Sequence, residues 1–348
     1  MHAAMSKCRS FWTTFRELPQ PLLGSLTLLF IFCANCWGQR SGDAVPLPSG
    51  ILFAASAPSG ESAENGQKPL ATLDPVAFVQ NGQLQGCFRT RAQESTVPKE
   101  TLVRLRKTYS KGRSYRLWLG GMPFGQAEAV KSCMNEDEMA EGGAVDIEGC
   151  FVLRPASGLS LPTDFAGTAW TGNVPIPTHN RIPSEVGAAD SARFQRLAQD
   201  AFRKHGVLAT SSQIHLSSVK TTRLRSDHLA IVGSALVQLP SAKERTFFSY
   251  RLFLVGEESN GEYLPILNHF HKSTVILDKD TPPPGAGEEL DEENDTDEEV
   301  FIDNFPLFPK EPDVIVTKHK RYEDWEYSVY RRLGAEYRLV YTGCGGGD

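Results

Sequence analysis

The chain has 348 residues, 40% of them hydrophobic and 22% charged, so it is long enough for two domains and able to bury a core. Its formal charge of -6 excludes a general nucleic-acid binder, because such proteins present a basic surface. Its 30 glycines and 22 prolines are typical of short strands joined by many turns.

Residues 1–38 have the features of a signal peptide or signal anchor. Lys7, Arg9 and Arg16 precede the uncharged apolar run 22–37, and small residues follow. Cleavage after Gly38 would release the chain, whereas an uncleaved segment 18–37 comes close to the roughly 20 residues that span a bilayer. We therefore expect an exported protein, periplasmic, envelope-associated or extracellular, that meets a membrane only through an uncleaved N-terminal segment.

Residues 39–72 are rich in Ser, Ala, Gly and Pro, and this composition predicts a disordered linker. Residues 73–178 follow as a small β domain, with turn signals at Asn81-Gly82 and Gly120-Gly121. Short candidate strands occupy 84–89, 101–106, 115–119 and 147–153. A small antiparallel barrel or sandwich is the expected fold of this domain.

Residues 187–343 predict a second domain, which begins with one helix. Asp190 or Ser191 is its expected N-cap, and Gly206 is its expected end. One apolar stripe at helical spacing contains Phe194, Leu197, Ala198, Ala201 and Phe202. This stripe predicts a helix packed against a sheet.

From residue 212 onward the hydrophobic period changes to two. The predicted strands lie at 214–216, 229–231, 247–255, 263–271, 300–304, 314–317, 325–329 and 337–341. Segment 247–255 is almost continuously apolar, as expected of a strand buried on both faces. The predicted fold class is α+β with mostly antiparallel strands.

Four cysteines lie beyond the N-terminal segment: Cys87, Cys133, Cys150 and Cys344. Export favours disulfides, and four cysteines allow three pairings that the sequence does not separate. Cys150 paired with either Cys133 or Cys87 would cross-link the first domain. The alternative is four reduced thiols, because a chain of this length can fold without disulfides.

The second domain contains an acidic insertion at 281–299. Carboxylates at positions one, three, five and nine of a loop suit calcium, which takes oxygen ligands from alternate residues. The residues at these positions are Asp291, Glu293, Asp295 and Glu299. The segment resembles the Asp-x-Asp-Gly-Asp-Gly-x-x-Glu loops of FG-GAP and VCBS-type repeats, and the Gly-rich C-terminus resembles the tails of exported bacterial proteins. The resemblance implies calcium as the cofactor. Because Asn294 and Thr296 replace the loop glycines, a hydrated acidic insertion is the alternative.

His269 and His271 lie two residues apart on a predicted strand, so both imidazoles should share one face. A metal pair needs this placement, with a third ligand from His215, His228 or a carboxylate. The alternative is two polar side chains on an exposed face.

Ser217 and Lys220 match the Ser-x-x-Lys motif of acyl-serine enzymes. That motif requires a helix, whereas 214–222 alternates like a strand, so we take the match as chance. Without a catalytic signature, a non-enzymatic β-rich binding or envelope-associated protein is the first hypothesis. The alternative is an envelope hydrolase whose dispersed histidines and carboxylates meet only in the fold. A pocket that joins His269, His271 and a carboxylate would favour this alternative.

Overall fold

The structure, a computed structural model, describes residues 49–57, 70–85, 103, 106–131, 150–162, 165–172, 184–224, 229–243, 245–277, 297–308, 311–321 and 324–347. The predicted signal or anchor at 1–38 lies outside these ranges, so export remains a prediction. Within them, no helix combines the length and the apolar content that a bilayer span requires.

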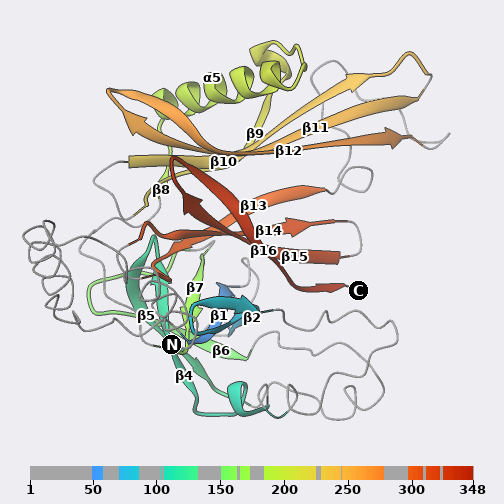
Figure 1. The fold of residues 1–348 in the computed structure, drawn as a ribbon. Coiled ribbons are helices and arrows are strands. Elements are labelled where there is room, and N and C mark those ends of the chain that lie inside the picture. Colours follow the sequence, from blue (N-terminus) through green and yellow to red (C-terminus); the bar gives the residue numbers. More distant parts are fainter. Residues whose placement is uncertain are drawn as a thin grey trace, which may run out of the picture. The chain divides into compact units, whose positions relative to one another are not determined.

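The first folded region is an antiparallel β-barrel of six strands (Figure 1). Its strands are β1 (Gly50–Ser56), β2 (Leu70–Gln80), β4 (Ser114–Leu119), β5 (Met122–Ala129), β6 (Phe151–Pro155) and β7 (Ala166–Trp170). They follow the order β1-β7-β4-β5-β6-β2, and pairing of β1 with β2 closes the barrel. β3 (Gln83–Gln85) extends β2 as a hairpin through Asn81-Gly82, where both residues have positive φ. Closure leaves no long free edge among the described strands of this region.

The first strand corrects the sequence prediction. β1 lies inside 39–72, so the predicted disordered linker is wrong for Gly50–Ser56. Phe53 and Ala55 point into the barrel, while Leu52 and Ala54 pack outside it. A strand buried on both faces does not show alternating apolar and polar residues. The composition of the whole predicted linker, averaged over its 34 residues, hides so short an apolar segment. The predicted strand at 101–106 is also wrong, because its described residues Val103 and Arg106 are helical.

The described residues of the second region, from Ser184 onward, form one long helix and two antiparallel sheets. The helix is α5 (Ala188–Lys204), followed by a short 3₁₀ turn, η3 (Ser211–Gln213). The five-stranded sheet, in spatial order, is β12 (Glu262–Ile276), β11 (Thr246–Ser259), β10 (Leu229–Pro240), β9 (His215–Arg223) and β8 (Ser184–Glu185). The four-stranded sheet is β13 (Glu298–Phe305), β14 (Val314–Lys320), β15 (Asp324–Leu333) and β16 (Glu336–Gly347). The predicted helix with mostly antiparallel strands is confirmed.

Helix α5 covers one face of the five-stranded sheet (Figure 1). All members of its predicted apolar stripe are buried against β10 and β11. The helix begins earlier than expected: its N-cap is Gly187, which makes no side-chain capping bond, and Asp190 lies in the first turn. Asp190 instead bonds to Arg193 at 3.4 Å and lies where the helix dipole favours negative charge.

The four-stranded sheet lies between the five-stranded sheet and the barrel. On one face, Phe301, Ile315 and Tyr330 share a core with residues of β10, β11 and β12. On the other face, Phe305 contacts Trp118 and Trp170 of the barrel, with ring centroids 5.4 and 5.7 Å apart. Residues from Leu47 onward therefore form one compact unit with continuous cores, rather than two independent domains.

A buried polar network joins the barrel to the four-stranded sheet. Asp303 is fully buried and accepts hydrogen bonds from the Gly120 amide at 2.7 Å and the Thr168 hydroxyl at 3.0 Å. Burial raises the pKa of Asp303 well above its ordinary value. The neighbouring Asn304 side chain donates to Asp313 at 2.7 Å. These bonds orient the Gly120-Gly121 turn of the barrel against β13.

Candidate functional site: a histidine and carboxylate cluster

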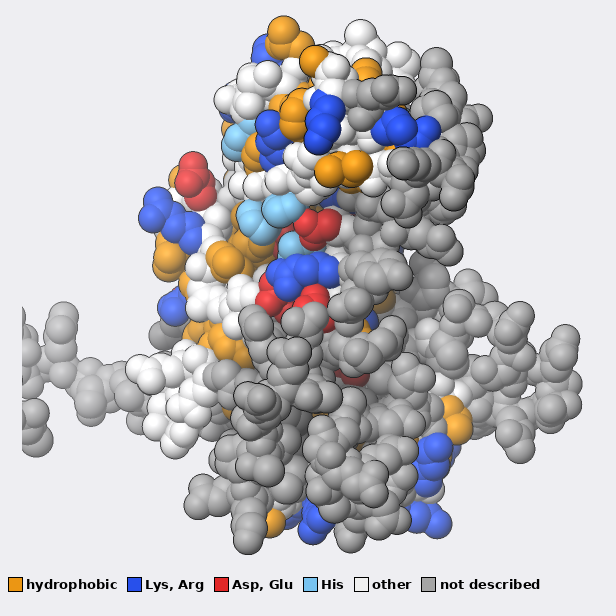
Figure 2. Space-filling model, turned by 90° about the vertical axis from the view of Figure 1, so that its right-hand side faces the viewer, with side chains coloured by type: hydrophobic (Ala, Val, Ile, Leu, Met, Phe, Trp, Pro, Cys, Tyr) orange, Lys and Arg blue, Asp and Glu red, His pale blue; other side chains and the backbone are white. Residues whose placement is uncertain are grey.

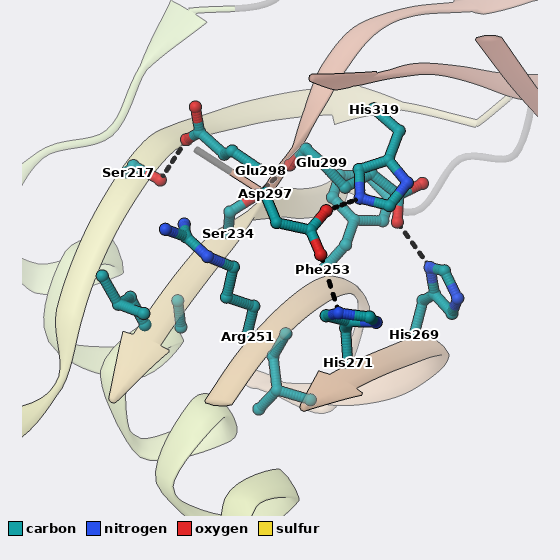
Figure 3. A pocket seen from close by; sticks show the side chains of 13 residues that line it. Ser217, Ser234, Arg251, Phe253, His269, His271, Asp297, Glu298, Glu299 and His319 are labelled. Atoms are coloured by element: carbon teal, nitrogen blue, oxygen red, sulfur yellow. Dashed lines mark hydrogen bonds and ion pairs between the residues drawn. The ribbon is translucent and has the colours of Figure 1, made fainter. Parts of the chain in front are cut away.

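Histidines and carboxylates from three strands converge in one pocket between the two sheets (Figure 3). β12 contributes His269 and His271, the segment entering β13 contributes Asp297 and Glu299, and β14 contributes His319. The two histidines of β12 are two residues apart, and so are Asp297 and Glu299, so each pair presents its side chains on one face of an extended chain. The prediction that His269 and His271 share a face is confirmed.

Glu299 is the buried end of this cluster, with 9% of its surface exposed. Its carboxylate accepts hydrogen bonds from the Thr317 hydroxyl at 2.6 Å, the Tyr330 hydroxyl at 2.8 Å and His269 Nδ1 at 2.5 Å. Burial alone would raise its pKa, but the bonds from His269, Thr317 and Tyr330 outweigh burial, so the pKa of Glu299 lies below its ordinary value. The group is held as an oriented carboxylate.

The His269 side chain is 43% exposed and lies in front of that carboxylate. The hydrogen bond to Glu299 raises the pKa of His269, with partial burial opposing the rise. Nδ1 faces Glu299, so the second ring nitrogen, Nε2, takes no part in this bond. A buried carboxylate that orients a half-exposed imidazole recurs in acid–base sites and behind metal-bound histidines.

Asp297 bridges the other two imidazoles. His271 Nε2 lies 2.7 Å from Asp297 Oδ2, and His319 Nε2 contacts the second oxygen, Oδ1. Burial by itself would raise the pKa of Asp297. The nearby His319, His271 and Arg251 lower it by more than burial raises it, so the pKa of Asp297 lies below its ordinary value. These atoms contact one another directly. In the described part of the chain, no group of three or more His, Cys, Asp or Glu side chains has the arrangement of a metal site.

Neighbouring charges surround the cluster. Glu326 Oε1 lies 3.9 Å from His319 Nδ1 and is itself paired with Arg321. Glu298 points the other way and accepts a hydrogen bond from the Ser217 hydroxyl at 2.9 Å. In the space-filling view, histidine, acidic and basic side chains gather on the same face of the molecule (Figure 2).

Of the four predicted calcium ligands, the structure places only Glu299. Asp291, Glu293 and Asp295 lie outside the described residues, so the calcium loop remains a prediction for them. Glu299 belongs to β13, and its carboxylate is already bonded to Thr317, Tyr330 and His269. Glu298 and Glu299 therefore continue the sheet rather than the acidic insertion 281–299.

The sequence prediction missed His319. The strand predicted at 314–317 extends to Lys320, and Thr317 and His319 then share a face at a spacing of two. Of the two histidines considered as a third partner, His215 lies on β9 away from the pocket lining, and His228 is outside the described residues. The Ser217–Lys220 motif lies on strand β9, so it lacks the helix that its chemistry needs.

The bonds of His269 and Glu299 predict a pH optimum for stability. The pKa of His269 is higher in the folded protein than its ordinary value of 6.5. Its bond to Glu299 therefore stabilises the fold fully below pH 6.5, and this stabilisation is lost as the pH rises through the pKa of the folded state. The pKa of Glu299 is lower in the folded protein than its ordinary value of 4.5. The ionised carboxylate therefore stabilises the fold fully above pH 4.5, and this stabilisation is lost as the pH falls through the pKa of the folded state. The stability difference between wild type and Glu299→Gln should therefore be largest between these two pH values.

Thermal unfolding at a series of pH values, with chelator present, measures this difference. The gap in melting temperature should narrow toward both pH 3 and pH 9, about two units beyond the ordinary pKa values of Glu and His. A gap that stays constant over the whole range would contradict the coupling.

Comparison of the chain with protein-family models, with characterised proteins and with solved structures finds no match. Any function must therefore be argued from the site itself.

Proposed function

We propose that the protein is a β-rich binding protein of the exported class, whose ligand site is the pocket where β12, β13 and β14 meet. The observation that carries this proposal is the convergence of three imidazoles and two carboxylates in a pocket. Elsewhere the same two sheets meet through apolar side chains such as Val255 and Ile315. Apolar contacts would join the sheets here as well, so a partly open polar cluster is better explained by ligand binding.

Two further properties support a binding site. The side chains of His269 and His271 are 43% and 46% exposed, so a ligand can approach them. The side chains of the carboxylates behind them are less exposed, at 8% for Glu299 and 22% for Asp297, and their bonds to the ring nitrogens orient the imidazoles. Shifted pKa values of His269, Asp297 and Glu299 occur together in this pocket, and such shifts cluster at functional sites.

Histidine NMR of the full chain tests the proposal across several classes of ligand. A library of carboxylic acids, amino acids, sugars, phosphate esters, carboxylic esters and divalent cations is added in turn. At least one component should shift the imidazole signals of His269, His271 and His319 in a saturable manner, while His205, on the opposite face of the sheet, should not respond. No saturable shift at millimolar concentration would contradict a binding role.

The second candidate function is the hydrolase. The observation that favours it is the His269–Glu299 pair, because an imidazole oriented by a buried carboxylate can accept a proton from an attacking water. The histidines and carboxylates also meet in one pocket, as this alternative requires. The same NMR titration separates the candidates: product signals from an ester, absent with His269→Gln, would establish hydrolysis, whereas shifts without product support binding alone.

A further inference from the structure

We propose that the protein forms a two-fold symmetric dimer, in which strand β12 of one copy pairs antiparallel with β12 of a second copy. The paired segment is 267–275, and His271 lies on the two-fold axis. This pairing joins the five-stranded sheets of the two copies into one continuous sheet. The inference concerns the edge of that sheet and does not depend on the function proposed for the pocket between the two sheets.

The outer side of β12 is a sheet edge. β12 lies at one side of the five-stranded sheet, and among the described strands it pairs only with β11 (Figure 1). A strand with one neighbour presents backbone N–H and C=O groups along its other side, where a further strand can pair with them. The pairing of β12 with β11 is regular from Leu267 to Ile276, after a register shift near Pro265. Segment 267–275 is therefore a regular edge without proline.

This edge has little of the usual protection against a second strand. Natural proteins protect sheet edges with lysine and other charged side chains, with proline or with bulges. Segment 267–275 contains one lysine and no acidic residue. The Lys272 ammonium lies over two rings of β11, 4.4 Å from the centroid of Phe248 and 5.4 Å from that of Tyr250. Because the lysine is directed back over its own sheet, its charge opposes a second strand less than an outward lysine would.

The segment is complementary to itself in the antiparallel register centred on His271. A two-fold interface requires this property, because the same surface is used by both copies. Residues equally distant from the centre lie opposite each other and share one face of the sheet. The resulting pairs are apolar with apolar, amide with hydroxyl, imidazole with hydroxyl and aromatic with cation: Leu267 with Val275, Asn268 with Thr274, His269 with Ser273, and Phe270 with Lys272.

Charge does not oppose this register. His271 faces its counterpart, but its Nε2 lies 2.7 Å from the Asp297 carboxylate of the same copy, which offsets the charge of a protonated imidazole. The two copies of Lys272 are only diagonal neighbours, and each ammonium lies over its own β11. Ile276, next to the paired segment, is 64% exposed, so the second strand also covers apolar surface.

Sedimentation equilibrium of the full chain over a range of protein concentrations tests the inference. We expect a reversible equilibrium between monomer and dimer. Asn268 and Thr274 are exposed and lie opposite each other across the axis, so substitutions there report on the pairing. The Asn268→Lys/Thr274→Lys variant places like charges opposite each other and should weaken the dimer by roughly tenfold or more. The matched Asn268→Lys/Thr274→Glu variant places opposite charges there and should dimerise at least as well as the wild type.

A chain that stays monomeric up to millimolar concentration would overturn the inference. So would a dimer that the double-lysine variant leaves unchanged, since the copies would then associate through another surface. Equal weakening in both variants would overturn the register centred on His271, because the loss would not depend on the sign of the opposed charges. Circular dichroism verifies that each variant is folded. The histidine NMR titration reads the pocket separately, so a failure of dimerisation leaves the proposed binding function standing.

Discussion

Replacing Glu299 with alanine is expected to destabilise the protein by about 2–4 kcal/mol. The substitution leaves the Thr317 hydroxyl, the Tyr330 hydroxyl and the His269 imidazole without the acceptor that all three use. Tyr330 lies among apolar side chains between the sheets, so water does not readily replace the lost partner. Denaturant unfolding of the full chain measures the change.

The adjacent Glu298 is a matched control, because it has the same chemistry one residue away. Its side chain leaves the cluster and, within the described part of the chain, bonds to the exposed Ser217 hydroxyl. Glu298→Ala should therefore change the free energy of unfolding by less than about 0.5 kcal/mol. Equal losses in the two variants would show that the bonds around Glu299 contribute nothing specific.

Replacing Gly121 with alanine is expected to destabilise the protein by about 2–5 kcal/mol. Gly121 has a φ of +73°, a conformation that costs a residue with a Cβ atom about 1–2 kcal/mol. A Cβ atom there would also lie 2.2 Å from Asp313 Oδ2 and 2.9 Å from Asn304 Nδ2. Both groups are buried at the contact between barrel and sheet, so this contact must shift to admit the methyl group.

Gly112 separates the two contributions. Its φ is +83°, but a Cβ atom there would meet nothing within 4 Å. Gly112→Ala should therefore show only the backbone strain, about 1–2 kcal/mol. Thermal unfolding of both variants gives the comparison. If Gly121→Ala lowers the free energy of unfolding no more than Gly112→Ala does, the buried network accommodates the methyl group without losing stability.

Local patterns predicted much of the second region. The stripe on 194–202 became the buried face of α5, and the apolar run 247–255 became the interior of β11. Both are signals within one element, where spacing alone assigns the buried face. Alternation in the same way placed His269 and His271 on one side of β12.

Other features depend on contacts that no local pattern contains. β1 was hidden because it packs on both faces, with Phe53 inside the barrel and Leu52 outside it. Asp303 bonds to residues more than 100 positions away in the sequence. The glycine pair Gly120-Gly121 predicted a turn, but not the contact of this turn with Asp303. His319 carried no signal of its own, since its role arises only when β14 lies beside β13.

The amino-acid sequence by itself determined a mostly antiparallel protein with one amphipathic helix and a histidine pair on one strand face, because these properties follow from the short-range geometry of helices and strands. Only the tertiary structure decided that this pair faces Asp297 and Glu299 and that His319 completes the cluster. The reason is physical: two sheets must first pack through their apolar faces before side chains about 25 to 30 positions apart in the sequence come within hydrogen-bonding distance.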